Sequence, residues 1–264
     1  MVGRLALFRM SPNRVIDWGA FLGAGAPSLM ATYPDAELIA IEPSEQLAMR
    51  SRQALRTPWW SRRRWKSPSV DVVIDSQSAR LNDAQLVWAN MMLHGVKDPP
   101  ALMHRWHRML SVGGFVMFSC LGPDSIRELT ALYSRLGWPA PTIDFVDMHD
   151  LGDMLMQAGF ADPVMDQESL TVQWSSAHAL CKDLRVLGGN VSPMRVPGLR
   201  TPRWMERLHR ELESLRDTSG RFSLTFEIVY GHAFKAAAPN KTEVQTQVSL
   251  EEMKRLMREA RRPA

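Results

Sequence analysis

Residues 15–44, VIDWGAFLGAGAPSLMATYPDAELIAIEPS, decide the fold that we expect for this chain. The expected elements are, in order, a β-strand ending at Asp17, a turn carrying Gly19, Gly23 and Gly25, a helix over residues 28–33, and a second strand ending at Glu42. This order is typical of the first crossover of nucleotide-binding α/β folds, in which a turn with little side-chain bulk lets a cofactor approach the backbone. An acidic residue about one such unit later binds a ribose, and Glu42 stands at a suitable distance from Gly19.

Length and composition indicate a globular protein with one main core. The chain has 264 residues, of which 45% are hydrophobic and 23% are charged. It contains no apolar run of about 18 residues, so no membrane-spanning helix is predicted, and its first residues do not form a secretory signal. Cys120 and Cys181 stand alone in the sequence, which favours a reducing compartment, and we expect the cytoplasm.

Positive charge is concentrated in one segment. The chain has a net charge of +4, yet seven basic and no acidic residues lie between Arg50 and Lys66, with three tryptophans interleaved. A solvated loop, a docking surface for an acidic protein and a site for single-stranded nucleic acid are all compatible with such a segment. No nucleic-acid-binding motif accompanies it, so nucleic acid is not an expected partner.

The rest of the chain predicts alternating strands and helices. Further strands are expected near residues 70–74, 84–90, 115–120, 162–174 and 223–234, and helices near 44–55, 99–110, 121–137, 148–158, 177–187 and 204–215. The helix that follows Cys120 is expected to be capped by Asp124 or Ser125. Together these elements predict a doubly wound, mostly parallel seven-stranded α/β sheet of the Rossmann type.

The order of elements also predicts the domain organisation. The expected parts are a core over residues 1–174, a helical cap inserted at 175–218, the last core strand within 219–238, and a linker with an amphipathic helix at 239–264. The terminal helix begins with Ser249 and Glu252 in capping-box spacing. We expect it to rest on the domain or to extend freely after the polar linker, rather than to bind a partner.

The sequence offers no metal site and no catalytic pair. Of the seven histidines, only His104 and His107 share a helix at close spacing, and no third ligand accompanies them. Cys120 is expected to be a small buried apolar residue. No catalytic residue is therefore predicted.

With the strands laid out, the chain resembles a class I S-adenosylmethionine-dependent methyltransferase. The segment LVWANMMLHGVKDPPALMHRWHRMLSVGGFVMFSCLGPDSIREL and the later blocks DMHDLGDMLMQAGFADPVMD and TFEIVYGHAFK are similar to those of the malonyl-acyl-carrier-protein O-methyltransferases of biotin synthesis and their relatives, which include a mitochondrial complex I assembly factor. The resemblance covers roughly residues 14–235.

The resemblance implies a site at the carboxyl ends of the strands. In such enzymes the methionine part of S-adenosylmethionine lies against the first strand end and its turn, which implies Asp17, Gly19 and Gly23 here. Glu42 would hold the ribose hydroxyls, and Asp75 would face the adenine. The methyl-transfer site is lined by the residues after the fourth strand, here Asn90, Met91 and Leu93.

The resemblance further implies an acidic acyl carrier protein as partner. We expect it to contact arginines of the basic segment and of the cap, namely Arg62, Arg63, Arg64, Arg195, Arg200, Arg203, Arg207 and Arg210. Methyl transfer to an already ionised malonyl carboxylate needs alignment in a dry pocket and no general base.

Departures from the family pattern leave other functions open. Phe21 replaces the middle glycine of the turn, the N-terminal helical segment of the relatives is mostly missing, and Asp144 stands where relatives often have an arginine. A catalytically inactive binding or assembly protein is therefore an alternative. A methyltransferase of another small substrate is a second alternative.

Overall fold

A seven-stranded sheet forms the centre of the computed structural model, which describes residues 1–6, 8–55, 70–188, 190–196 and 198–237. Neighbouring strands follow the order β3-β2-β1-β4-β5-β7-β6. The strands are β1 Arg14–Trp18, β2 Glu37–Glu42, β3 Asp71–Ile74, β4 Ala84–Ala89, β5 Leu110–Leu121, β6 Ala161–Trp174 and β7 Phe222–Phe234. Only β7 runs antiparallel to its neighbours β5 and β6 among the pairings described. The mostly parallel sheet predicted from the sequence is confirmed.

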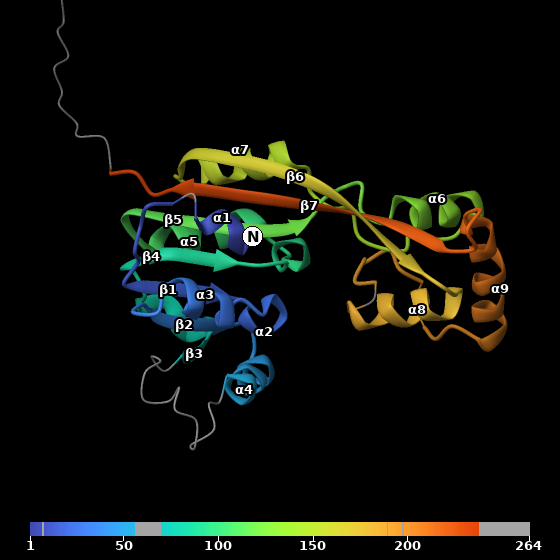
Figure 1. Ribbon diagram of the computed structural model, residues 1–264, viewed down its shortest axis with the longest axis horizontal. Helices are drawn as coiled ribbons and strands as arrows, with labels where there is room; N and C mark the ends of the chain where they lie inside the picture. The colour runs from blue at the N-terminus through green and yellow to red at the C-terminus, as the bar shows by residue number, and fades with distance from the viewer. Residues whose placement is uncertain (7, 56–69, 189, 197, 238–264) are drawn as a thin grey trace, which may run out of the picture.

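Helices connect the strands and cover both faces of the sheet (Figure 1). They are α1 Val2–Leu5, α2 Ala20–Gly23, α3 Ala26–Thr32, α4 Glu45–Ala54, α5 Pro99–Met109, α6 Arg127–Arg135, α7 Met148–Gln157, α8 Ala177–Val186 and α9 Pro202–Leu212. Short 3₁₀ turns occur at η2 Asp75–Arg80, η3 Leu93–Gly95 and η4 Glu213–Leu215. Within the described ranges, no helix has both the length and the apolar character that crossing a bilayer requires.

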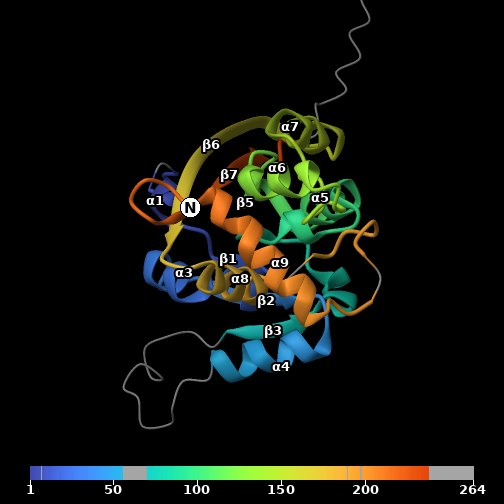
Figure 2. The ribbon, with the colours of Figure 1, turned by 90° about the vertical axis from the view of Figure 1, so that its right-hand side faces the viewer.

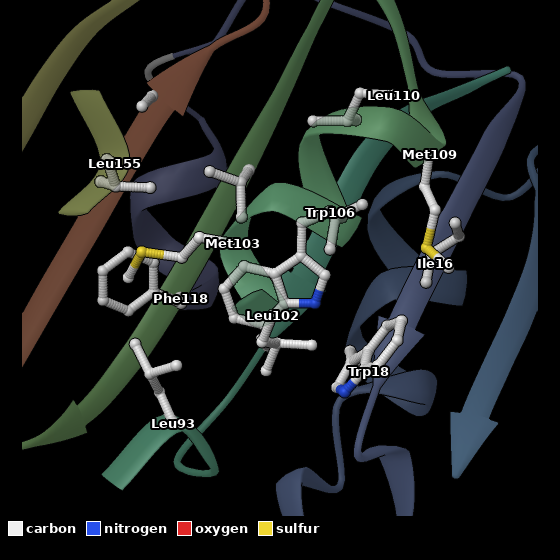
Figure 3. Packing of buried hydrophobic residues seen from close by; sticks show 14 of the residues in the cluster. Ile16, Trp18, Leu93, Leu102, Met103, Trp106, Met109, Leu110, Phe118 and Leu155 are labelled. Atoms are coloured by element: carbon white, nitrogen blue, oxygen red, sulfur yellow. The ribbon is translucent and has the colours of Figure 1, made fainter. Parts of the chain in front are cut away.

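Successive side chains of each central strand pack on opposite faces of the sheet, as the two-residue period of a strand requires. In β1, Val15 packs with α1 and α3, whereas Ile16 and Trp18 pack with α5 and α7. Trp106 of α5 lies at the middle of this second cluster, between Trp18 and Phe118 (Figure 3). Asp17 therefore lies on the same face as Val15, toward α3.

A third cluster forms beyond the carboxyl ends of the strands. There β6 and β7 extend past the sheet and carry α6, α8 and α9 (Figure 1), with α8 and α9 in front of the strand ends when the molecule is viewed from that side (Figure 2). Leucines of these helices pack with Trp174 and Phe222. We call α6, α8, α9 and the segment 187–201 the cap. The predicted domain boundaries stay a prediction. One helix that we placed in the core, α6, belongs to the same hydrophobic cluster as α8 and α9.

Two local expectations are wrong. The glycine turn contains a single helical turn, α2, because left-handed residues at Gly19 and Ala24 separate it from β1 and α3. Neither Asp124 nor Ser125 caps α6: the backbone N–H of Asp124 donates to Glu227, and α6 starts after Ile126, which has a positive φ of 51°. The turn is therefore fixed by a distant strand rather than by its own cap.

Two predicted features fall outside the described residues. Arg62, Arg63 and Arg64 belong to residues 56–69, whereas the first arginines of the basic segment, Arg50 and Arg52, lie on α4. The terminal amphipathic helix belongs to residues 238–264.

Candidate active site

A cavity of about 990 Å³ separates the strand ends from the cap. One wall comes from the ends of β1 and β2, from η3 and from α5, and includes Trp18, Gly19 and Glu42. The opposite wall comes from the cap and includes Leu180, Arg200 and Trp204. The carboxyl edge of a doubly wound sheet is where such folds bind ligands, so we call this space the main cavity and treat it as the candidate site.

Glu42 is a buried carboxylate on the wall of the main cavity, and its side chain is 0% exposed. Its Oε1 accepts a hydrogen bond from the backbone N–H of Phe21 at 2.7 Å and another from the Ser51 hydroxyl. Its Oε2 is buried and has no partner among the described residues. A buried acceptor without a donor costs free energy, so this oxygen suits a ligand that brings hydroxyl groups.

Phe21 does not occupy the main cavity. The half-buried side chain is absent from the described lining, whereas its neighbour Leu22 belongs to it and is 68% exposed. The ring of Phe21 faces α4, where the guanidinium carbon of Arg50 lies 5.8 Å from the ring centroid. The backbone of Phe21 contributes through its bond to Glu42, and its ring stays outside the space that Gly19 and Glu42 line. The short helix α2 turns this side chain away from the site.

Asp17 lies behind the turn, fully buried on the α3 side of the sheet. Neither carboxyl oxygen has a hydrogen-bond partner among the described residues, and Oδ2 lies close to Gly25, as does the unpartnered indole nitrogen of Trp88. Burial, reinforced by the nearby charge of Glu42, raises the pKa of Asp17 to about 7. Asp17 therefore changes its charge near neutral pH.

This raised pKa makes the stability of the protein depend on pH. The folded chain keeps a proton on Asp17 up to about pH 7, whereas the unfolded chain releases it near the ordinary value of 3.8. Rising pH therefore favours the unfolded chain between these values and has no further effect through this group above about 7. We expect Asp17 to lower the free energy of unfolding by about 2 to 3 kcal/mol between pH 5 and pH 7.

The isosteric variant Asp17→Asn tests this expectation, because its amide resembles the protonated acid in shape but does not titrate. Urea unfolding of both proteins between pH 5 and pH 7 should show that the free energy of unfolding falls more steeply with rising pH in the wild type than in the variant. The same dependence of the free energy of unfolding on pH in both proteins would contradict a raised pKa at Asp17.

Gly23 and Asn90 are joined by a hydrogen bond. The amide nitrogen of Asn90 donates to the carbonyl of Gly23 at 2.7 Å, and its amide oxygen accepts from Ser119 at 2.8 Å. A Cβ on Gly23 would lie 2.8 Å from the Asn90 carbonyl, so only glycine fits this approach. Neither residue is among those lining the main cavity. Asn90 thus ties the end of β4 to the turn, and a direct contact of either residue with a cofactor stays a prediction.

Asp75 forms an ion pair with Arg105 of α5, which also lies over Trp18 with its guanidinium carbon 5.1 Å from the ring centroid. Both members of the pair line the main cavity and also a neighbouring cavity of about 470 Å³. Asp75 therefore lies on the wall of the candidate cofactor site, but Arg105 neutralises its charge. Sequence reasoning missed Arg105, because no local pattern pairs residues 75 and 105.

His94 lies on the wall of the main cavity beside the strand ends. Its Nδ1 accepts a hydrogen bond from the backbone N–H of Leu121 at 3.3 Å, and its ring packs edge-on against Phe145. Burial lowers the pKa of His94 below its ordinary value of 6.5. The ring is therefore neutral at pH 7, with the proton on Nε2.

The two walls of the main cavity differ in charge. The strand-end wall carries the carboxylate of Glu42, the ion pair of Asp75 and Arg105, and the adjacent, oppositely charged Lys97 and Asp98. The cap wall carries Arg185 and Arg200, and no acidic residue occurs among the described cap residues that line the cavity. The cavity is thus suited to a cationic, hydroxyl-bearing molecule at one end and an anionic molecule at the other. In the described ranges, no group of three or more His, Cys, Asp or Glu residues is placed to hold a metal ion.

Comparison with known sequences agrees with this geometry. The profile of a family described as "Methyltransferase domain" matches residues 2–162. A malonyl-acyl-carrier-protein O-methyltransferase from Gallionella capsiferriformans is 35% identical over 240 residues, which are 90% of this chain and 82% of that protein. The protein of the same name from Laribacter hongkongensis is 34% identical over 90% of this chain and 81% of its own length.

Solved structures share the fold at low sequence identity. The YcgJ protein from Bacillus subtilis has a TM-score of 0.61 at 11% identity, covering 90% of this chain and 98% of its own. A putative methyltransferase from Bacillus halodurans has a TM-score of 0.56 at 13% identity, covering 89% of this chain and 97% of its own. These similarities establish the architecture.

Proposed function

The chain belongs to the family of methyltransferase domains, and from this membership we propose that it moves a methyl group from S-adenosylmethionine to the carboxylate of a malonyl-like acyl group on an acyl carrier protein, as in biotin synthesis. The observation that carries the proposal is the similarity, over 90% of this chain, to proteins named for this reaction. The placement of Phe21 outside the main cavity favours this function over the inactive binding protein that the sequence left open.

The residues at the strand ends fit the cofactor. Glu42 has a buried oxygen free to accept from ribose hydroxyls, and Gly19, which adopts a φ of 69° that favours glycine, lies on the cavity wall beside Met92. Asp17 lies behind this turn as a second carboxyl group. When bound, the cofactor supplies an electrophilic methyl group on a positively charged sulfur.

The protein's task toward the acceptor is alignment and exclusion of water. A carboxylate is ionised at pH 7 and attacks without losing a proton, so neutral His94 does not need to act as a base. Leu129, Leu180 and Leu208 of the cap line the space in which the acceptor would lie. Holding both reactants there supplies several kcal/mol of the barrier reduction.

The test combines binding with turnover. Calorimetry with S-adenosylmethionine, followed by an assay of methyl ester formation on malonyl-acyl carrier protein, should show binding and product for the wild type. Phe21→Ala keeps the backbone N–H that donates to Glu42, so its cofactor affinity should stay within about threefold of the wild type. Tight binding by the variant with none by the wild type would identify a blocked site and refute the enzymatic function.

We propose that the carrier docks on the exposed arginines of the cap. Arg203, Arg207 and Arg210 follow one face of α9 at helical spacing and are exposed. Acyl carrier proteins are strongly acidic, and opposite charge speeds and orients association. Arg62, Arg63 and Arg64 extend this proposal outside the described residues.

Charge reversal of these three α9 residues to glutamate should weaken carrier binding at least about tenfold at low salt, with a smaller difference at high salt. Surface plasmon resonance at two ionic strengths measures the effect, and cofactor affinity serves as the control because the three side chains lie off the main cavity. Unchanged carrier binding would remove α9 from the docking surface.

We also propose the cytoplasm as the place of action. Both cysteines are free thiols, Cys120 buried as predicted and Cys181 half-buried, and such thiols suit a reducing compartment.

A further inference from the structure

Arg200 is a cation of the cap wall without a carboxylate partner. It lines the main cavity, and in the described part of the chain no Asp or Glu oxygen lies within ion-pair distance of it. Arg105, on the opposite wall, is already neutralised by Asp75. An arginine that faces a cavity with its charge uncompensated is suited to an anionic ligand.

The guanidinium of Arg200 is held in place by an aromatic ring. Its central carbon lies 4.1 Å from the centroid of Trp204, which itself lines the main cavity and packs against Trp138 at a centroid distance of 5.3 Å. Stacking on an indole orients the planar group and leaves its edge of N–H donors free. The positive charge of Arg200 also acts on Tyr133 of the cap. It partly offsets the rise in the pKa of Tyr133 that burial causes.

Position 144 does not supply a cation to the acceptor. Pro141, Thr142, Ile143 and Phe145 line the main cavity, whereas the exposed Asp144 between them is not among the lining residues. The acid at this position therefore lies off the cavity wall. The lining cations without a carboxylate partner among the described residues are Arg185 and Arg200 of the cap and Lys97 beside η3.

We propose that Arg200, oriented by Trp204, binds an anionic group of the methyl acceptor and makes the enzyme specific for anionic acceptors. This inference rests on the proposed function and adds a specificity-determining residue to it. Two groups of an acceptor carried on a phosphopantetheine arm have this chemistry: the reacting carboxylate and the phosphate of the arm. A carboxylate held by a bidentate guanidinium keeps further lone pairs free to attack the methyl group.

The experiment compares two acceptors with the full chain. Malonyl-N-acetylcysteamine carries the carboxylate without a phosphate, and malonyl-coenzyme A carries both groups. We expect Arg200→Ala to raise the KM by about ten- to a hundredfold, the loss expected for a charge-assisted hydrogen bond. The KM of Arg200→Lys, which keeps the charge and loses the planar guanidinium, should lie between those of the wild type and Arg200→Ala. The matched control is Lys182→Ala, which removes an exposed cation of cap helix α8 that lies off the cavity wall and outside the proposed docking surface, and its KM should be unchanged.

The outcomes separate the possibilities. If Arg200→Ala raises the KM for both acceptors, Arg200 binds the carboxylate. If it raises the KM for malonyl-coenzyme A alone, Arg200 binds the phosphate. An unchanged KM for both acceptors, or an equal rise of the KM in Lys182→Ala, overturns the proposal. Acceptor binding to protein loaded with S-adenosylhomocysteine is measured by calorimetry in parallel. Acceptors that bind through Arg200 without being methylated would contradict the proposed function while supporting the inference.

Discussion

Replacing Glu42 by glutamine is expected to weaken the binding of S-adenosylmethionine by about a hundredfold or more, because two charge-assisted hydrogen bonds to ribose hydroxyls would be lost. The side chain is fully buried, and its two oxygens have different surroundings. Oε1 is satisfied by Phe21 and Ser51, whereas Oε2 has no partner among the described residues. Glutamine can keep the first set of bonds through its amide oxygen, and it places an NH₂ group where an acceptor is needed.

This substitution separates two functions of Glu42. If the carboxylate only fixed the turn around α2, glutamine would preserve that function and cofactor binding would not change. Ser51→Ala is the matched control, since it removes a hydrogen bond to Oε1 and leaves Oε2 in place. We expect its affinity to fall less than tenfold. Calorimetry with S-adenosylmethionine measures both variants, and circular dichroism checks that each is folded.

Replacing Trp106 by alanine is expected to reduce the free energy of unfolding by about 3 to 5 kcal/mol, the usual cost of removing a large buried aromatic side chain. Trp106 is 0% exposed, and its ring centroid lies 6.2 Å from that of Trp18 and 6.3 Å from that of Phe118. The indole thus fills the space between α5 and two strands (Figure 3). Because domains are stable by only about 5 to 15 kcal/mol, this loss is a large share of the total.

Trp106→Phe is the informative control. The indole nitrogen of Trp106 is buried and has no hydrogen-bond partner among the described residues, so phenylalanine removes an unsatisfied donor while keeping most of the ring. We expect it to cost less than half as much as alanine. Urea unfolding with an unchanged m-value measures both variants. A loss below about 1 kcal/mol for Trp106→Ala would show that the neighbouring side chains collapse into the space.

The fold was largely predictable, and the reason is local. The expected strands after residue 70 and the helices over 99–110, 148–158 and 177–187 lie within a few residues of β3 to β7, α5, α7 and α8. Their periodicity, caps and glycines are properties of short segments. The start of α6 was not predictable in this way, because Glu227, about a hundred residues further along the chain, holds the turn before it.

The site was predictable only in outline. Gly19, Glu42 and Asp75 all lie on the wall of the main cavity, as the position of strand ends in a parallel sheet implies. Arg200 and Trp204 were visible in the sequence only as part of a basic, aromatic-containing cap. Nothing in their spacing indicates that they face the same cavity as Glu42, because the length and twist of β6 and β7 decide where the cap lies.

By itself, then, the sequence determined the order of elements, the doubly wound sheet and the family, since each of these depends on patterns within a few dozen residues. Tertiary structure alone decided that the ring of Phe21 turns toward Arg50, that Arg105 neutralises Asp75, and that Arg200 faces the cavity. A side chain's direction and charge partner depend on contacts with residues distant in the chain. Such contacts are fixed only when the elements pack together.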